Sequence, residues 1–349
     1  MSRFFFFAAF LIFIIFMLAL DLGVFHKKDH VIKIKEAAIW TAVWVLLALL
    51  FGLLLFFRAE WVHDIRCIED LLAYVKGTDL EALIQPEMSY SAALKVYRKE
   101  VFSQYLAGYF LEESLSIDNI FVMIMIFVSF GINKKYYHRV LFWGILGAIV
   151  LRFLFIFLLG ALVGRFSWVL AVFGVILIYS GVKMFVSNNE EKIDTANHPA
   201  VKFASRFFPV TRELHDHRFF VSLDGRTFMT PLFLVLVVIE FSDIIFAVDS
   251  IPAVFSVTTD PYIVFFSNIF AIMGLRSLFF LLSNVTDKFY LLRYGLGLLL
   301  CFIGVKMIGH EFFHFSISTV TSLMVILGIL VGSVLLSLLF PKRKHKPVQ

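Results

Sequence analysis

Three carboxylates lie inside one apolar run of the chain, and no Lys or Arg accompanies them. The run extends from Met229 to Phe255 and contains EFSDIIFAVDSIPA, whose acidic residues are Glu240, Asp243 and Asp249. A charge at bilayer depth costs roughly 2.5–3.5 kcal/mol on insertion scales, so buried acids of this kind mark a functional site by default. We therefore expect a site within the membrane whose partners lie on other segments.

The spacing of these acids limits how one helix can present them. Glu240 and Asp243 are three residues apart and share a face, whereas Asp249 lies about 240° further round an ideal helix. Pro252 cannot donate a hydrogen bond to the Val248 carbonyl and disfavours helical backbone just before it. We therefore predict a broken helix beside Asp249, with freed carbonyls available as ligands, as in discontinuous transporter helices.

A second acidic motif, LEESLSIDNI, lies in an earlier apolar run and repeats the first. Its pattern Glu112-x5-Asp118-Asn119 answers Asp243-x5-Asp249-Ser250. Two further landmarks recur in the same order, since LRF at 151–153 answers LRS at 275–277, and GVKM at 181–184 answers GVKM at 304–307. Each unit holds three membrane spans. Because three is an odd number, the second unit starts on the opposite side of the membrane and crosses it in the opposite direction. We predict an inverted repeat with a substrate site near the midplane.

Composition makes the chain a polytopic, all-α membrane protein, because 60% of its 349 residues are hydrophobic and its mean hydropathy is +0.90. We predict about nine transmembrane helices. Their expected ranges are 4–22, 37–57, 105–128, 139–163, 167–186, 229–255, 262–284, 289–309 and 316–340. The first is also open to interpretation as a signal peptide, but its apolar core is long and no clean cleavage site follows, which favours an uncleaved helix.

Loop charges set the expected orientation. The side that holds the C-terminal tail carries more than twice as many Lys and Arg residues as the other side, so the C-terminus is expected in the cytoplasm and the N-terminus outside. The expected organisation is two N-terminal transmembrane helices (1–57), an exterior amphipathic loop (58–104), the first three-helix repeat (105–186), a cytoplasmic loop (187–228), the second, inverted repeat (229–309), and a C-terminal helix with a basic tail (310–349).

The predicted core carries more acids than bases. The acids are Glu112, Glu113, Asp118, Glu240, Asp243 and Asp249, and the bases are Arg152, Lys183, Arg276 and Lys306. A divalent cation would neutralise the excess negative charge, as would protonation of one or two carboxylates. Because only oxygen ligands surround the site, Mg²⁺, Ca²⁺ or Mn²⁺ would suit it better than Zn²⁺ or Cu⁺.

Each of these residues has a functional and a structural interpretation. The expected metal ligands are Asp118, Asp249, Asp243, Glu240, Glu112, Asn119 and Ser250, and the residues expected to balance charge are Arg152, Arg276 and Glu113. In the structural alternative, the acids form ion pairs with Arg152 or Arg276 and bind no metal. Lys183 and Lys306 lie at span ends, where snorkelling explains them. The many Phe and Leu residues are expected to face lipid.

Several classes of function find no support in the sequence. Cys67 and Cys301 provide neither a disulfide framework nor a thiolate metal cluster. We find no Walker motif, no nucleophile–base pair that would indicate an enzyme, and no basic patch for nucleic acid. We expect no permanently bound cofactor.

The motifs LEESLSIDNIFV and FSDIIFAVDSIPA, the GVKM pair and the N-terminal stretch beginning LDLGVF make this chain resemble the TerC/Alx family of bacterial integral membrane proteins. The likeness covers most of the chain from Asp21 to Leu339. It implies a link to tellurite resistance and to Mn²⁺ export, and a fold grouped with LysE-type transporters. The family's intramembrane acidic positions correspond here to Glu112, Asp118, Asn119, Asp243, Asp249 and Ser250, with Asp21 as a weaker candidate.

We therefore expect a secondary-active exporter of divalent cations, with Mn²⁺ as the ion, in the bacterial inner membrane. Uncompensated export of a divalent ion against the potential costs about 4.6 kcal/mol per 100 mV, whereas exchange for two protons is electroneutral. Protons and lipid are thus the other expected partners. The alternative is a membrane stress-response scaffold for tellurite or pH resistance, whose buried ion pairs are structural.

Overall fold

The structure is a computed structural model that describes most of the chain. The described residues are 3–25, 33–76, 78, 80–166, 168–186, 198–211, 218–223, 226–283, 291–313 and 317–339, without the side chains of 21–25. The long helices are α1 (Arg3–Phe25), α2 (Ile34–Arg58), α5 (Tyr90–Ser129), α6 (Tyr137–Arg165), α7 (Trp168–Val186), α9 (Pro231–Phe255), α10 (Pro261–Leu282), α11 (Leu292–Phe313) and α12 (Thr319–Leu339). The short elements are α3 (Glu60–His63), α4 (Ile68–Val75), the 3-10 helix η1 (Lys134–Tyr136), α8 (Pro199–Ala204) and the antiparallel strands β1 (Phe220–Leu223) and β2 (Arg226–Met229).

Eight of the described helices are long and apolar enough to cross a membrane, which confirms an all-α, multi-pass membrane protein. The ninth span expected from the sequence, 105–128, lies within the 40-residue helix α5. The membrane-depth part of α5 carries Glu112, Glu113 and Asp118, and these charges set it apart from the other eight helices.

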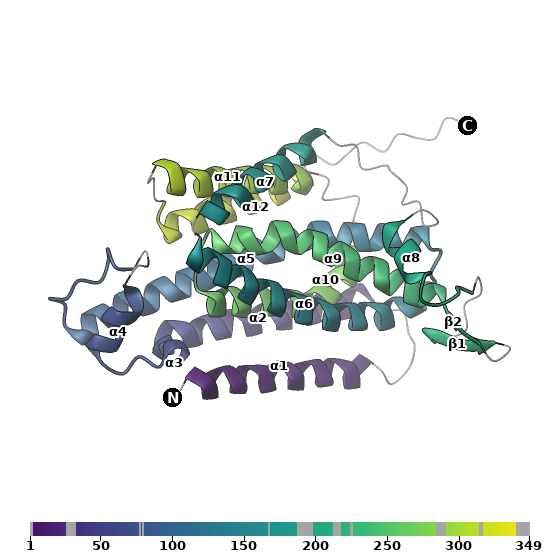
Figure 1. Ribbon diagram of the computed structural model, residues 1–349, viewed down its shortest axis with the longest axis horizontal. Coiled ribbons are helices and arrows are strands. Elements are labelled where there is room, and N and C mark those ends of the chain that lie inside the picture. The colour runs from purple at the N-terminus through teal and green to yellow at the C-terminus, as the bar shows by residue number, and fades with distance from the viewer. Residues whose placement is uncertain are drawn as a thin grey trace.

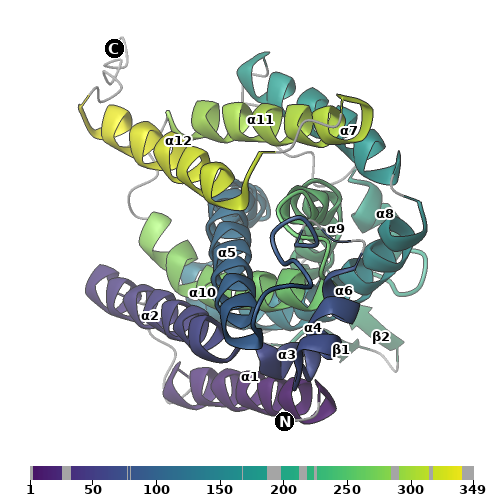
Figure 2. The ribbon, with the colours of Figure 1, turned by 90° about the vertical axis from the view of Figure 1, so that its left-hand side faces the viewer.

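Helix α10 lies at the centre of the bundle, between α5, α2 and α6 (Figures 1 and 2). Every residue of its apolar window is buried. Helices α7, α11 and α12 form a separate layer on one side, and α1 and α2 cover the opposite side (Figure 2). The α5, α6, α9 and α10 helices, which hold most of the predicted site residues, are thus enclosed between two outer groups.

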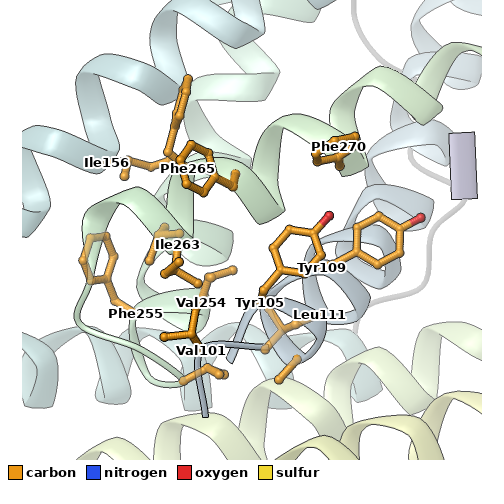
Figure 3. Close-up of a cluster of buried hydrophobic side chains, with 14 of the residues drawn as sticks. Val101, Tyr105, Tyr109, Leu111, Ile156, Val254, Phe255, Ile263, Phe265 and Phe270 are labelled. Carbon is orange, nitrogen blue, oxygen red and sulfur yellow. The ribbon is translucent and has the colours of Figure 1, made fainter. Parts of the chain in front are cut away.

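Aromatic rings fill much of the core, so the expectation that the Phe residues face lipid is only partly correct. Phe10 of α1 packs against Phe266 of α10 with ring centroids 4.5 Å apart, and Phe51 of α2 lies 5.0 Å from Phe270. Figure 3 shows the neighbouring part of this core, where the rings of Phe270 and of Tyr105 on α5 have centroids 6.3 Å apart. These ring contacts attach α1 and α2 to α10.

Helix α9 is continuous, so the predicted break beside Asp249 is wrong. Pro252 lies inside the helix, which ends only three residues later at Phe255. A proline so close to the end removes one hydrogen bond from the last turn, and the backbone beyond it is held by the amide of Ser256, which donates to the Pro252 carbonyl at 3.0 Å. Asp249 is therefore presented by regular helix.

Helices α7 and α11 approach each other through two pairs of glycines. A Cβ atom on Gly181 would lie 2.6 Å from the carbonyl oxygen of Gly297, and one on Gly304 would lie 2.5 Å from that of Gly174. Each GVKM sequence thus supplies a glycine that contacts the partner helix, and the contact is reciprocal. The inverted repeat itself stays a prediction.

The segment expected as an exterior loop is partly helical and attached to the bundle by a buried polar group. The His63 imidazole contacts Asp260 with Nε2 2.8 Å from Oδ2, and its Nδ1 lies 2.6 Å from the Tyr97 hydroxyl. The Tyr74 hydroxyl also donates to Asp260 at 2.9 Å. Asp260 in turn caps α10 by accepting from the Tyr262 amide at 2.9 Å.

Candidate functional site

The guanidinium of Arg152 is the centre of a buried polar cluster. Arg152 of α6 is fully buried and pairs with Glu112 of α5, which is also fully buried, and with Asp243 of α9, with Nη2 3.3 Å from Oδ1. Its Nη1 donates to the Asn268 side-chain carbonyl of α10 at 2.9 Å. One side chain therefore joins four helices by charge and hydrogen bonds.

The charges within this cluster do not cancel. Glu112 and Asp243 carry two potential negative charges against the single positive charge of Arg152. The second carboxylate oxygens, Glu112 Oε2 and Asp243 Oδ2, are buried and have no hydrogen-bond partner in the structure. Because an unpaired charge in a dry interior is costly, a proton or a small cation at these oxygens would stabilise the cluster.

The second acid of each motif lies outside the Arg152 cluster. Asp249 accepts hydrogen bonds from the Ser180 hydroxyl of α7, at 3.1 Å to Oδ1 and 3.2 Å to Oδ2, and is also attracted by Lys183. Asp118 interacts electrostatically with Arg293 of α11 and with Asp249 itself. The two motifs thus meet at Arg152, through Glu112 and Asp243, and their second acids, Asp118 and Asp249, interact electrostatically outside that cluster.

The residues that follow these aspartates are buried polar groups. Asn119 is 3% exposed and Ser250 is 1% exposed, and within the described part of the chain both Asn119 Nδ2 and Ser250 Oγ lack a hydrogen-bond partner. Among the described residues, no three Asp, Glu, His or Cys side chains come close enough to hold a metal ion together. Two carboxylates with amide and hydroxyl oxygens would therefore bind an ion that keeps some of its water.

Two further acids lie apart from both pairs. The carboxylate of Glu240 faces Gly147 of α6, where even a Cβ atom would collide with it, and it interacts electrostatically with Asp243. The carboxylate of Glu113 points towards Gly274 of α10, 4.0 Å from where a Cβ atom would stand. The continuous helix α9 thus presents Asp243 to Arg152 and Asp249 to Ser180, whereas Glu240, which shares a face with Asp243, is directed towards Gly147.

The basic residues of the predicted core have different surroundings. Arg152 pairs with acids of both motifs, as described above. Arg276 is buried at 3% exposure and contacts the His138 ring, with Nη1 3.0 Å from Nε2. Lys306 donates to the Ser256 carbonyl at 2.9 Å. The side chain of Asp21 lies outside the described part of the chain.

Three contact residues were missed by the motif analysis. Asn268 and Ser180 are polar residues within largely apolar helices, and Arg293 lies in the first turn of α11. The few polar residues in the runs IVFFSNIFAIM and ILIYSGVKM were the available signal for the first two. No spacing rule could have connected Arg293 to Asp118, because they are brought together only by packing.

The fold and these charges define a polytopic membrane protein with ionisable groups in its interior. The profile of the integral membrane protein TerC family matches residues 97–345, more than two thirds of the chain. The chain belongs to the TerC family, which confirms that part of the resemblance.

Curated relatives match over nearly the whole length. The chain is 43% identical over 341 residues to "Uncharacterized membrane protein STKORF319" of Myxococcus xanthus, with 97% of this chain and 93% of that protein covered. It is 40% identical over 316 residues to "Putative membrane-bound redox modulator Alx" of Escherichia coli K12, with 90% and 88% covered. No solved structure matches the chain.

Proposed function

We propose that this protein is a secondary-active exporter of divalent cations, with Mn²⁺ as the ion. The observation that carries the proposal is the placement of Asp118 and Asp249, the second acids of the two motifs, on the packed helices α5 and α9, where the two carboxylates interact electrostatically. Two carboxylates that repel each other at membrane depth bind a divalent cation favourably, because the ion removes their mutual repulsion and neutralises both.

The ligands near this pair have the chemistry of a hard-cation site. Ser180 contacts Asp249 directly, and Asn119 and Ser250 follow the two aspartates in the sequence. All offer oxygen and none offers sulfur or imidazole, which favours Mn²⁺, Mg²⁺ or Ca²⁺ over Zn²⁺ or Cu⁺. The reciprocal glycine contacts of α7 and α11 support an inverted repeat around this site.

The Arg152 cluster is the proton-binding part of the proposal. Glu112 and Asp243 share one guanidinium and have unpartnered oxygens, so one proton at this pair would balance the cluster. Exchange of one divalent ion for two protons would be electroneutral. In the proposed orientation, in the bacterial inner membrane, the C-terminus is cytoplasmic and the ion leaves towards the 58–104 segment.

Cellular metal content tests this function. We expect cells lacking the protein to accumulate Mn²⁺ in Mn²⁺-rich medium and to regain normal content when the gene is restored, as measured by elemental analysis. Zn²⁺ content is the internal control and should not change. Equal Mn²⁺ content in cells with and without the protein would refute the proposal. A change in Zn²⁺ content alone would refute the ligand assignment.

A structural scaffold is the second candidate, because Arg152 joins four helices in the way a structural ion pair does. The name of the Escherichia coli relative refers to redox modulation, and both cysteines of this chain, Cys67 and Cys301, are free thiols. The two candidates differ at Asp118 and Asp249. Neutralising either should stop transport in a folded exporter, whereas a scaffold should lose stability instead.

A further inference from the structure

A cavity of about 820 Å³ lies between α8 and the first half of α9. Its α9 wall is almost entirely apolar and extends from Phe233 through Leu236 and Val237 to Ile244. Its charged lining residues are Lys202 and Arg206 on the α8 side and Glu240 on α9. A long apolar wall with two cations on the facing element is an unusual surface for a soluble ligand.

The two elements run in opposite directions, which fixes the position of the charges along the cavity. At the start of α8, the His198 ring lies 5.9 Å from the ring of Phe241. At its end, Ala204 packs in one apolar cluster with Leu234 and Met229. Lys202 and Arg206 therefore lie towards the beginning of α9, at the membrane surface, and the apolar wall continues inwards.

The residues of α8 and those just after it have the composition of a membrane interface. Lys202 and Arg206 are exposed, and Phe203 and Phe207 are 61% and 66% exposed. Aromatic and basic side chains of this kind gather at the level of lipid headgroups, where the rings enter the apolar region and the cations stay in water.

We propose that this cavity binds an anionic phospholipid. Lys202 and Arg206 bind the phosphate, and one acyl chain lies along the α9 wall from Leu236 to Ile244. Glu240 does not oppose the phosphate, because it lies seven residues beyond Phe233, about 10 Å deeper along the helix. Its carboxylate is also directed towards Gly147 of α6. The two cations at the mouth disfavour a metal cation as the occupant.

Native mass spectrometry of the purified full chain tests the proposal, with phosphatidylglycerol as the probe and phosphatidylcholine of the same chain length for comparison. We expect a bound phosphatidylglycerol that survives at higher collision energy than phosphatidylcholine. The double variant Lys202→Gln/Arg206→Gln should bind it roughly thirtyfold more weakly, since each basic residue near an anionic lipid contributes about 1 kcal/mol. Binding of phosphatidylcholine should not change.

The matched control removes one Lys and one Arg that are also exposed but lie outside the cavity, in Lys134→Gln/Arg226→Gln. Its affinity for phosphatidylglycerol should equal that of the wild type. The variant Val237→Phe, which fills the apolar wall without changing charge, should also weaken binding. Equal affinity for the two lipids, equal loss in the control, or full binding by Val237→Phe would overturn the proposal. So would binding of glycerol 3-phosphate as strong as that of the lipid.

Discussion

Glu112 and Asp243 contact the same guanidinium, that of Arg152, although they lie on different helices and in different motifs. The two acids occupy equivalent positions in the repeated pattern, six residues before Asp118 and Asp249. The repeat in the sequence therefore corresponds to a shared location in the folded chain. Each motif thus contributes its first acid to the Arg152 cluster, and its second acid lies outside that cluster.

The first prediction concerns Asp118 and Asp249. We expect Asp118→Asn and Asp249→Asn each to abolish most Mn²⁺ transport into everted vesicles driven by a proton gradient, because Asn keeps the volume and an oxygen but removes the charge. The double variant should be little worse than either single one, since residues that act as a unit are not additive. Asp64→Asn, at a half-buried site outside both motifs, serves as the control at matched expression. Near-normal transport in either single variant would show that the two acids do not share an ion.

Arg152→Ala should destabilise the protein more than any other single removal of a charge. It leaves two buried carboxylates without their cation, and breaking such a pair costs about 3–5 kcal/mol. Arg165→Ala, which removes an exposed arginine at the end of the same helix, should have little effect. Unfolding in detergent, followed by circular dichroism, measures both. Equal effects would contradict the role of the cluster in holding the helices together.

Asp260 should make stability depend on pH. Burial acts to raise the pKa of this carboxyl group. The charge of His63, and the hydrogen bonds that the carboxylate accepts from His63, Tyr262 and Tyr74, outweigh burial and hold the pKa below its usual value. Because the pKa is lower in the folded state, the stabilisation is present above the unfolded value, about 3.9, and is lost as the pH falls through the folded one.

We therefore expect Asp260→Asn to melt at a lower temperature than the wild type at pH 7, with the difference shrinking as the pH falls below about 4. Asp64→Asn, in the same segment, is again the control, and its left-handed backbone, with φ of 56°, accepts Asn. A difference that stays constant from pH 7 to pH 3 would argue against the charge interaction.

The glycine contacts between α7 and α11 make a steric prediction. Gly181→Ala and Gly304→Ala should each cost about 1–3 kcal/mol, because the new methyl group meets a backbone carbonyl that cannot turn away. Gly328→Ala on α12 has open space around it and should be neutral or stabilise by up to about 1 kcal/mol. Thermal melts of the three variants suffice, and the idea fails if all three behave alike.

Orientation is tested by reporter fusions. A fusion after Gln349 should report from the cytoplasm and one after Ala82 from the exterior, because the positive loops lie on the C-terminal side. The reverse result for either fusion would exclude the proposed direction of export and the odd number of spans per unit.

Much of the fold was readable from the sequence because hydropathy determines the membrane helices, whereas the contacts of the site depend on packing. The acidic motifs indicated which residues would be buried, but not that Arg152 would pair with the first acid of each and leave Asp118 and Asp249 outside the cluster. Pro252 misled the prediction, since α9 continues through it and ends only three residues later.

The backbone contact between α7 and α11 has a mechanical consequence for Asp249. With carbonyl groups against glycines, the two helices cannot slide past each other without new collisions, so we expect them to move as one rigid unit. Ser180 lies on α7 and so belongs to this unit, whereas Asp249 lies on α9. A tilt of α7 and α11 relative to α9 would therefore stretch or release the hydrogen bond between Ser180 and Asp249. Because such coupling is reciprocal, a change in what Asp249 binds also shifts the preferred tilt of α7 and α11. Asp249 is thus coupled to the position of this helix pair as well as being a candidate ligand.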